Sequence, residues 1–101
     1  MQSPLPYLVE AQLAALGNRI AVARKARCWT QGDLANRAGV GLNSIVNIER
    51  GAPTVQFGYW ALALWALGLL DGLGDVAQLQ DDREGLELIK ERMPRRVRGT
   101  T

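Results

Sequence analysis

The run from Thr30 to Gly51, TQGDLANRAGVGLNSIVNIERG, constrains the fold more than any other part of the chain. Thr30 and Asp33 form a capping-box-like pair, which is typical of the start of a helix. The glycine at Gly39 can adopt a positive φ, so it predicts a tight turn after that helix. A second helix follows over about residues 42–50, and Gly51 ends it. The run therefore predicts two short helices joined by a glycine turn, the arrangement by which a helix-turn-helix presents its second helix.

Apolar spacing and capping residues predict helices over the rest of the chain as well, with no convincing alternating strand. The first helix covers about residues 6–27, and Cys28 follows it at a position where a left-handed conformation is strained for any residue but glycine. Three more helices are expected: one opened by Pro53 and capped by Thr54, one over about 72–79 after Asp71, and one over about 83–92 after Asp81-Asp82. The expected fold class is all-α.

Composition narrows the function classes. The chain has 101 residues, about half of them apolar, which is enough for a core without disulfides or metal. It has one cysteine, Cys28, and no histidine, so we expect no metal, no cofactor and no disulfide. We also expect no enzymatic activity, because Cys28 has no histidine partner and the carboxylates around Asp82 suit a helix N-terminus. The start of the chain lacks a signal-peptide pattern, and the longest apolar run, 57–70, is too short to span a bilayer. We therefore expect a cytoplasmic protein.

The net charge of +2 is unevenly distributed along the chain. Residues 1–50 contain six Lys/Arg and three Asp/Glu. Residues 51–90 contain two Lys/Arg and six Asp/Glu, and residues 91–101 contain four Lys/Arg and one Asp/Glu. The front of the chain is thus basic, its middle acidic and its end basic. A basic segment around the two short helices favours a nucleic-acid partner.

The second short helix carries the residues best suited to reading bases. Ile45 and Ile48 are expected to face the core, and Asn43 and Asn47 are four residues apart, so they share another face. Asparagine can bridge N6 and N7 of adenine in the major groove, and Leu42 can contact a thymine methyl group. Arg50, at the far end of the helix, and Gln31, at the start of the helix before it, are placed for phosphates.

The chain resembles the Cro/phage-repressor-like (XRE) helix-turn-helix family over about residues 13–79. The resemblance rests on R-x-A-R before the first turn, T-Q at Thr30, L-A-x-x-A-G-V, I-x-x-I-E-R-G, and A-L-G after the fourth helix. It implies a five-helix phage-repressor-like bundle, a homodimer, and binding to a double-stranded DNA operator through the second short helix. A weaker resemblance, to HipB-type antitoxins, rests on chain size, on the stretch GLLDGLGDVAQL and on the arginine-rich ending.

Carried over by position, the first resemblance implies a role for individual residues. Gln31 contacts backbone and supports the start of the second short helix, while Arg24 and Glu49 form a partly buried structural ion pair. The DNA-binding positions are Gln31, Gly41, Leu42, Asn43, Ser44, Asn47 and Arg50. Gly41 departs from the family, which often has a capping Ser or Thr there, and Leu42 stands where a polar reader is common.

Two segments leave alternatives open. The fourth helix has more large side chains than one small bundle needs, which indicates a dimer interface or a partner surface beyond the core. The arginines of the C-terminal arm either remain solvated, contact DNA or dock on an acidic partner; they are Arg92, Arg95, Arg96 and Arg98.

The sequence thus predicts a helix-turn-helix domain over 7–79 and a C-terminal helix with a basic arm over 80–101. The expected function is sequence-specific DNA binding by a repressor, in the setting of an antitoxin that represses its own operon. The alternative is a protein-interaction module that mainly neutralises a toxin, a HipA-type kinase, through the fourth helix and the basic tail. We expect no membrane association.

Overall fold

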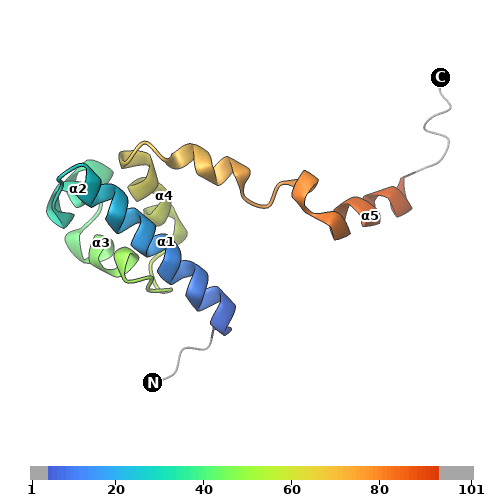
Figure 1. Cartoon of the computed structure of the whole chain (residues 1–101), viewed down its shortest axis with the longest axis horizontal. Helices are drawn as coiled ribbons and strands as arrows, with labels where there is room; N and C mark the ends of the chain where they lie inside the picture. Colours follow the sequence, from blue (N-terminus) through green and yellow to red (C-terminus); the bar gives the residue numbers. More distant parts are fainter. Residues whose placement is uncertain (1–4, 94–101) are drawn as a thin grey trace. The chain divides into compact units, whose positions relative to one another are not determined.

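The computed structural model describes residues 5–93, and that part of the chain is all-helical, as the sequence predicts (Figure 1). The chain divides into two compact units, Met1–Leu70 and Asp71–Thr101, so residues 71–79 lie in the second unit. Within 5–93, every helix is too short or too polar to cross a bilayer. The first unit contains four α-helices: α1 (Tyr7–Ala26), α2 (Gln31–Ala38), α3 (Leu42–Glu49) and α4 (Phe57–Ala66). The 3-10 helix η1 (Leu70–Asp75) begins at the boundary between the units. The second unit contains the 3-10 helix η2 (Leu79–Asp81) and the α-helix α5 (Arg83–Arg92).

The two short helices of the first unit form where the sequence predicts them. The Thr30 hydroxyl accepts a hydrogen bond from the Asp33 N–H at 3.0 Å, and the Asp33 carboxylate accepts one from the Thr30 N–H at 2.8 Å. This reciprocal capping box begins α2, and Gly39, with a φ of 75°, ends it. Gly51, with a φ of 79°, follows α3, so both predicted glycine turns are confirmed.

The core of the first unit lies where α1, α2, α3 and α4 meet. Its largest fully buried side chains are Ile20, Leu34, Ile45 and Ile48, and the inward orientation predicted for the two isoleucines of α3 is therefore confirmed. Gly17 of α1 is buried directly against α3, because a Cβ at this position would collide with the carbonyl oxygen of Ile48. The two backbones can approach this closely only because residue 17 has no side chain.

The corner between α1 and α2 carries the strain that the sequence indicates. Cys28 has a φ of 59°, a left-handed conformation that disfavours a side chain. The corner is held by backbone hydrogen bonds from the N–H groups of Cys28 and Trp29 to the carbonyls of Lys25 and Arg24, at 2.9 and 3.3 Å.

The predicted start of the fourth helix is wrong by two residues. Thr54 does not cap α4; the helix begins at Phe57, and Gln56 is its N-cap residue. The residues in between form a turn after Gly51, in which the Ala52 N–H donates to the Asn47 carbonyl at 2.9 Å and Val55 is half-buried. Packing of this turn beside the bundle, and not the local capping preference of threonine, sets the start of the helix.

The α-helix predicted over 72–79 is also wrong. Residues Leu70–Asp75 form a 3-10 helix instead, with Asp71 inside it, and a second short 3-10 helix follows at Leu79–Asp81. Gly72 and Gly74 lower helix propensity, and Ala77 interrupts the segment with a φ of 61°. The last predicted helix is confirmed: Asp82 caps α5 by accepting a hydrogen bond from the Gly85 N–H at 2.9 Å.

Candidate nucleic-acid interface

The rotation of α3 about its axis is fixed by two of its residues. Ile45 and Ile48 are fully buried, so the side chains between and before them point away from the core. Asn43 is exposed, Asn47 is half-buried, and Leu42 leaves 52% of its surface exposed. The structure therefore places all three predicted base-reading residues on the accessible part of α3.

The N-terminus of α3 has no side-chain cap among the described residues. Gly41 is its N-cap residue, with an extended backbone (φ −72°, ψ 157°), and it is exposed. No acidic side chain lies in the first turn of the helix. The Ser44 N–H donates to the Gly41 carbonyl at 3.1 Å, so the N–H groups of Leu42 and Asn43 and the positive end of the helix dipole are the ones without compensation, an arrangement that favours an anion such as phosphate.

A groove runs beside α3, and the sequence did not indicate half of its lining. It encloses about 290 Å³, and one wall is formed by Asn43, Ser44 and Asn47 of α3. The opposite wall comes from the turn before α4 and from its first residues, namely Thr54, Val55, Gln56 and Tyr59. Only the conformation of the turn after Gly51 brings this wall to α3, so no spacing pattern in the sequence could have identified it.

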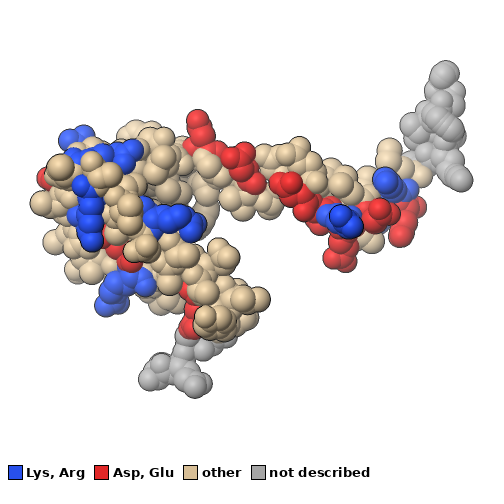
Figure 2. Space-filling model, in the orientation of Figure 1, with Lys and Arg blue, Asp and Glu red and all other residues tan. Residues whose placement is uncertain are grey.

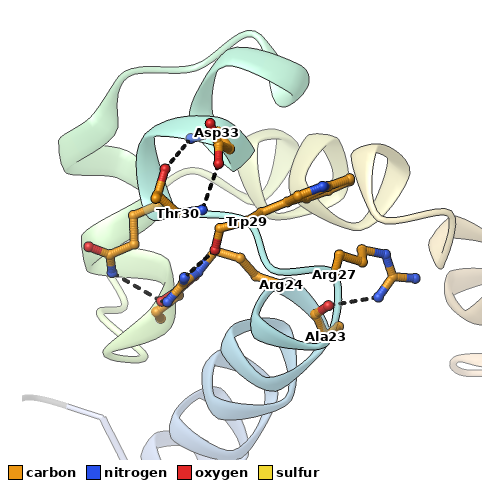
Figure 3. Close-up of polar contacts among 8 residues, drawn as sticks. Ala23, Arg24, Arg27, Trp29, Thr30 and Asp33 are labelled. Carbon is orange, nitrogen blue, oxygen red and sulfur yellow. Dashed lines mark hydrogen bonds and ion pairs between the residues drawn. The ribbon is translucent and has the colours of Figure 1, made fainter.

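The predicted pair between α1 and α3 is present and nearly buried. Arg24 donates from Nε to Oε2 of Glu49 at 2.7 Å and from Nη2 to Oε1 at 3.0 Å, with side-chain exposures of 10% and 7%. Its Nη1 donates to the Trp29 carbonyl at 2.8 Å (Figure 3). The hydrogen bond to the Glu49 carboxylate raises the pKa of Arg24, while burial acts in the opposite direction. The Arg24 guanidinium is thus paired with an opposite charge and also hydrogen-bonded to a backbone carbonyl, and both oxygens of the Glu49 carboxylate accept hydrogen bonds.

Gln31 belongs to the same network. Its Nε2 donates to Oε1 of Glu49 at 3.0 Å, so it supports the last residue of α3. The expectation that Gln31 supports the start of this helix is therefore wrong. With Arg24 on α1 and Gln31 on α2, the Glu49 carboxylate connects three helices and fixes the position of α3.

Arg27 and Arg37 form a second cluster that sequence reasoning missed. Arg27 donates from Nη1 to the Ala23 carbonyl at 2.7 Å and from Nη2 to the Leu67 carbonyl at 2.9 Å, which joins the ends of α1 and α4. The guanidinium carbon of Arg37 lies 4.1 Å from the centroid of the Trp29 ring, and that of Arg27 lies 5.9 Å from it. Trp29 itself is half-buried.

Positive charge gathers on the first unit, and negative charge is concentrated after α4. Lys and Arg side chains lie over the helices of the first unit, while Asp and Glu side chains dominate residues 71–91 (Figure 2). Arg50 is exposed at the C-terminal end of α3 and contributes to this positive surface. The positive charge therefore lies on the unit that carries α3.

The C-terminal arm can be placed only in part. Arg92 is the last residue of α5 and is exposed. The other three arginines of the predicted arm, Arg95, Arg96 and Arg98, lie outside the described residues.

Comparison with known proteins is consistent with this geometry. No family model and no solved structure matches the chain. A curated protein of Sinorhizobium fredii, named "Uncharacterized HTH-type transcriptional regulator y4mF", is 42% identical to this chain over 55 residues, which are 54% of this chain and 72% of that protein. Together with the observed pair of short helices and glycine turn, this identity shows that the chain belongs to the helix-turn-helix (HTH) type transcriptional regulators.

Proposed function

We propose that this protein binds double-stranded DNA in a sequence-specific manner, with α3 in the major groove, and represses transcription by covering a promoter. The observation that carries the proposal is the placement of Asn43 and Asn47 on the accessible part of a helix whose rotation is fixed by buried Ile45 and Ile48. A helix held in this way presents the same side chains to every duplex it meets, which direct readout requires.

Base contacts are assigned to three residues of α3. The amide group of each of Asn43 and Asn47 can donate from its nitrogen to N7 and accept at its oxygen from the N6 amino group of adenine, a bidentate arrangement, so A·T pairs are preferred at two positions. Leu42 packs against a thymine methyl group. Since only two polar readers are available, base-specific hydrogen bonds are few and each carries a large share of the specificity.

Phosphate contacts are assigned to the edges of the same surface. The uncapped N-terminus of α3 at Gly41 and the guanidinium of Arg50 lie at opposite ends of the helix, and Gln31 and Ser44 flank it. These contacts orient the protein and carry no sequence information themselves. The groove adds Gln56 and Tyr59, which line it together with Asn43 and Asn47. The arginines of the C-terminal arm, Arg92 onward, provide further phosphate contacts.

We further propose that the protein acts as a homodimer on a palindromic operator in the cytoplasm. Half-sites then lie about one helical turn apart. The leading biological setting is an antitoxin that represses its own operon.

The test is an electrophoretic mobility shift of the full chain on the DNA upstream of its own gene, with unspecific competitor and at two salt concentrations. We expect a specific complex whose affinity falls steeply with salt, and whose specificity is lost in the Asn43→Ala/Asn47→Ala double variant. Folded protein that shows no preference for this DNA over competitor would contradict the proposal for this operator.

A second candidate function is neutralisation of a toxin, such as a HipA-type kinase, by an interaction surface on α4 and the arm. It is favoured by exposed apolar side chains on α4, with Phe57 64% and Trp65 58% exposed. Co-expression with a kinase-like neighbouring gene product separates the two functions. A stable complex whose formation is indifferent to the Asn43→Ala/Asn47→Ala change would support the second.

A further inference from the structure

The corner between α1 and α2 gathers two arginine side chains around one indole ring. The guanidinium carbon of Arg37, on α2, lies 4.1 Å from the centroid of the Trp29 ring, and that of Arg27 lies 5.9 Å from it. Both distances fall within the range of a cation–π contact. The two arginines are exposed to solvent. We call Arg27, Trp29 and Arg37 the corner cluster.

The positive charge of the corner cluster has no counter-charge among residues 5–93. Neither Arg27 nor Arg37 forms an ion pair with a carboxylate of this part of the chain. Asp33 lies one turn before Arg37 on α2, but its Oδ2 accepts the hydrogen bond from the Thr30 N–H at 2.8 Å and does not pair with the guanidinium. Two like charges beside one ring repel each other, so an anion bound between them stabilises both.

The two guanidinium groups of the cluster are held in different ways. Arg27 donates from Nη1 to the Ala23 carbonyl (Figure 3) and from Nη2 to the Leu67 carbonyl, so backbone oxygens fix its position without neutralising its charge. The Arg37 side chain makes no hydrogen bond to a described residue. Its planar fork of N–H donors can therefore bind a carboxylate through two parallel hydrogen bonds. Stacking on Trp29 already restricts this side chain, which lowers the entropic cost of binding.

The corner cluster lies away from the groove beside α3. That groove is lined by residues at the start of α4, among them Gln56 and Tyr59. The hydrogen bond from Arg27 to the Leu67 carbonyl places the cluster at the other end of the same helix. Since α4 has ten residues, its two ends are about 15 Å apart. This separation favours a protein segment with carboxylates as the partner of the cluster, rather than a phosphate of a duplex bound at α3.

We propose that the corner cluster is a docking site for an acidic segment of a partner protein. One carboxylate of the segment binds the Arg37 fork, and a second lies beside the Arg27 guanidinium. Charge complementarity selects an acidic segment, and tryptophan and arginine are the side chains that most often dominate binding energy in protein interfaces. The site goes beyond the proposed function, because it adds a protein partner on a surface separate from α3.

The test titrates acetylated hexaglutamate into the isotope-labelled full chain at 0.15 M salt, where diffuse attraction between exposed charges is screened. NMR follows the indole Nε1–H signal of Trp29, which is distinct from those of Trp60 and Trp65. We expect a saturable shift of the Trp29 signal. Arg37→Gln should weaken binding about tenfold or more, the effect of losing one charge-assisted hydrogen-bonded contact. Arg37→Lys, which keeps the charge without the fork, should also weaken it.

The matched control is Arg19→Gln, because Arg19 is an exposed arginine of α1 outside the corner cluster. It should bind hexaglutamate as the wild type does. No shift at Trp29, or equal weakening by Arg19→Gln and Arg37→Gln, would overturn the inference. A short duplex DNA that shifts the Trp29 signal in the wild type but not in Arg37→Gln would assign the cluster to the DNA backbone and overturn it as well.

This outcome is separable from base recognition. The Asn43→Ala/Asn47→Ala variant retains the corner cluster, so it should bind hexaglutamate as the wild type does while losing its DNA sequence preference. Failure of the peptide to bind leaves the DNA-binding proposal standing, and failure of DNA recognition leaves the docking site standing.

Discussion

Arg24 and Glu49 face each other across the contact between α1 and α3, and two hydrogen bonds of 2.7 and 3.0 Å join them. Glu49 is the last residue of the helix that carries Asn43 and Asn47. The pair therefore connects the longest helix of the first unit to the helix assigned to DNA. Gln31 of α2 donates to the same carboxylate, so α1, α2 and α3 are joined at Glu49.

Glu49→Gln should lower the free energy of unfolding by about 3 kcal/mol, because it leaves the nearly buried Arg24 guanidinium without its counter-charge. Chemical denaturation measures this loss. Glu87→Gln, on exposed α5, is the control and should change stability little. A Glu49→Gln protein as stable as the control would show that the pair contributes nothing to the fold.

Gly17→Ala should destabilise the protein by about 2 kcal/mol or more, because the new methyl group meets the backbone of α3 at the Ile48 carbonyl. Gly32→Ala is the matched control in α2. A Cβ there meets only the Thr30 hydroxyl at 3.7 Å, so alanine should be neutral or stabilise by up to about 1 kcal/mol. Thermal unfolding of both variants measures the difference, and equal melting temperatures would mean that the helices do not approach as closely as described.

The pH dependence of stability should report the α2 capping box. The hydrogen bond from the Thr30 N–H lowers the pKa of Asp33 below its ordinary value. A carboxyl group whose pKa is lower in the folded state stabilises the fold above its unfolded pKa, and this contribution is lost as the pH falls through the folded pKa, below about pH 4. Melting temperatures of wild type and Asp33→Asn, measured from pH 7 down to pH 2, should converge at the acid end. A constant difference between them would exclude the charge of Asp33 as the cause.

Asn47→Ala and Arg50→Ala should affect DNA binding in different ways. Asn47→Ala should relax the preference at one base position, at a cost of about 1–3 kcal/mol. Arg50→Ala should weaken binding to all sequences by a similar factor and make the affinity less dependent on salt. Titrations of one operator and its single-base variants at several salt concentrations measure both. A change of base preference in Arg50→Ala would make Arg50 a base reader.

Local signals in the sequence predicted the first unit well. The Thr30–Asp33 capping box, the glycine turns at Gly39 and Gly51 and the buried Ile45 and Ile48 depend on residues only a few positions apart, and all are present. The Arg24–Glu49 pair spans 25 residues, and it was predicted because the family resemblance supplied the pairing, which spacing alone does not.

The features that the sequence missed depend on packing between distant segments. Thr54 is a good capping residue, but the turn after Gly51 lies beside α3 and delays α4 to Phe57. The Arg27 hydrogen bond to the Leu67 carbonyl joins residues 40 positions apart and has no local signature. Residues 70–75 form a 3-10 helix because glycines outweigh the apolar spacing that indicated an α-helix.

The central claim is that α3 reads duplex DNA through Asn43 and Asn47. The most direct measurement is selection of bound sequences from a pool of random duplex DNA, with the wild-type protein and the Asn43→Ala/Asn47→Ala variant in parallel. The account predicts that the wild type enriches palindromic sites with A·T pairs in half-sites about one helical turn apart, and that the folded variant enriches none. Enrichment of the same motif by both proteins, or by neither, would contradict it.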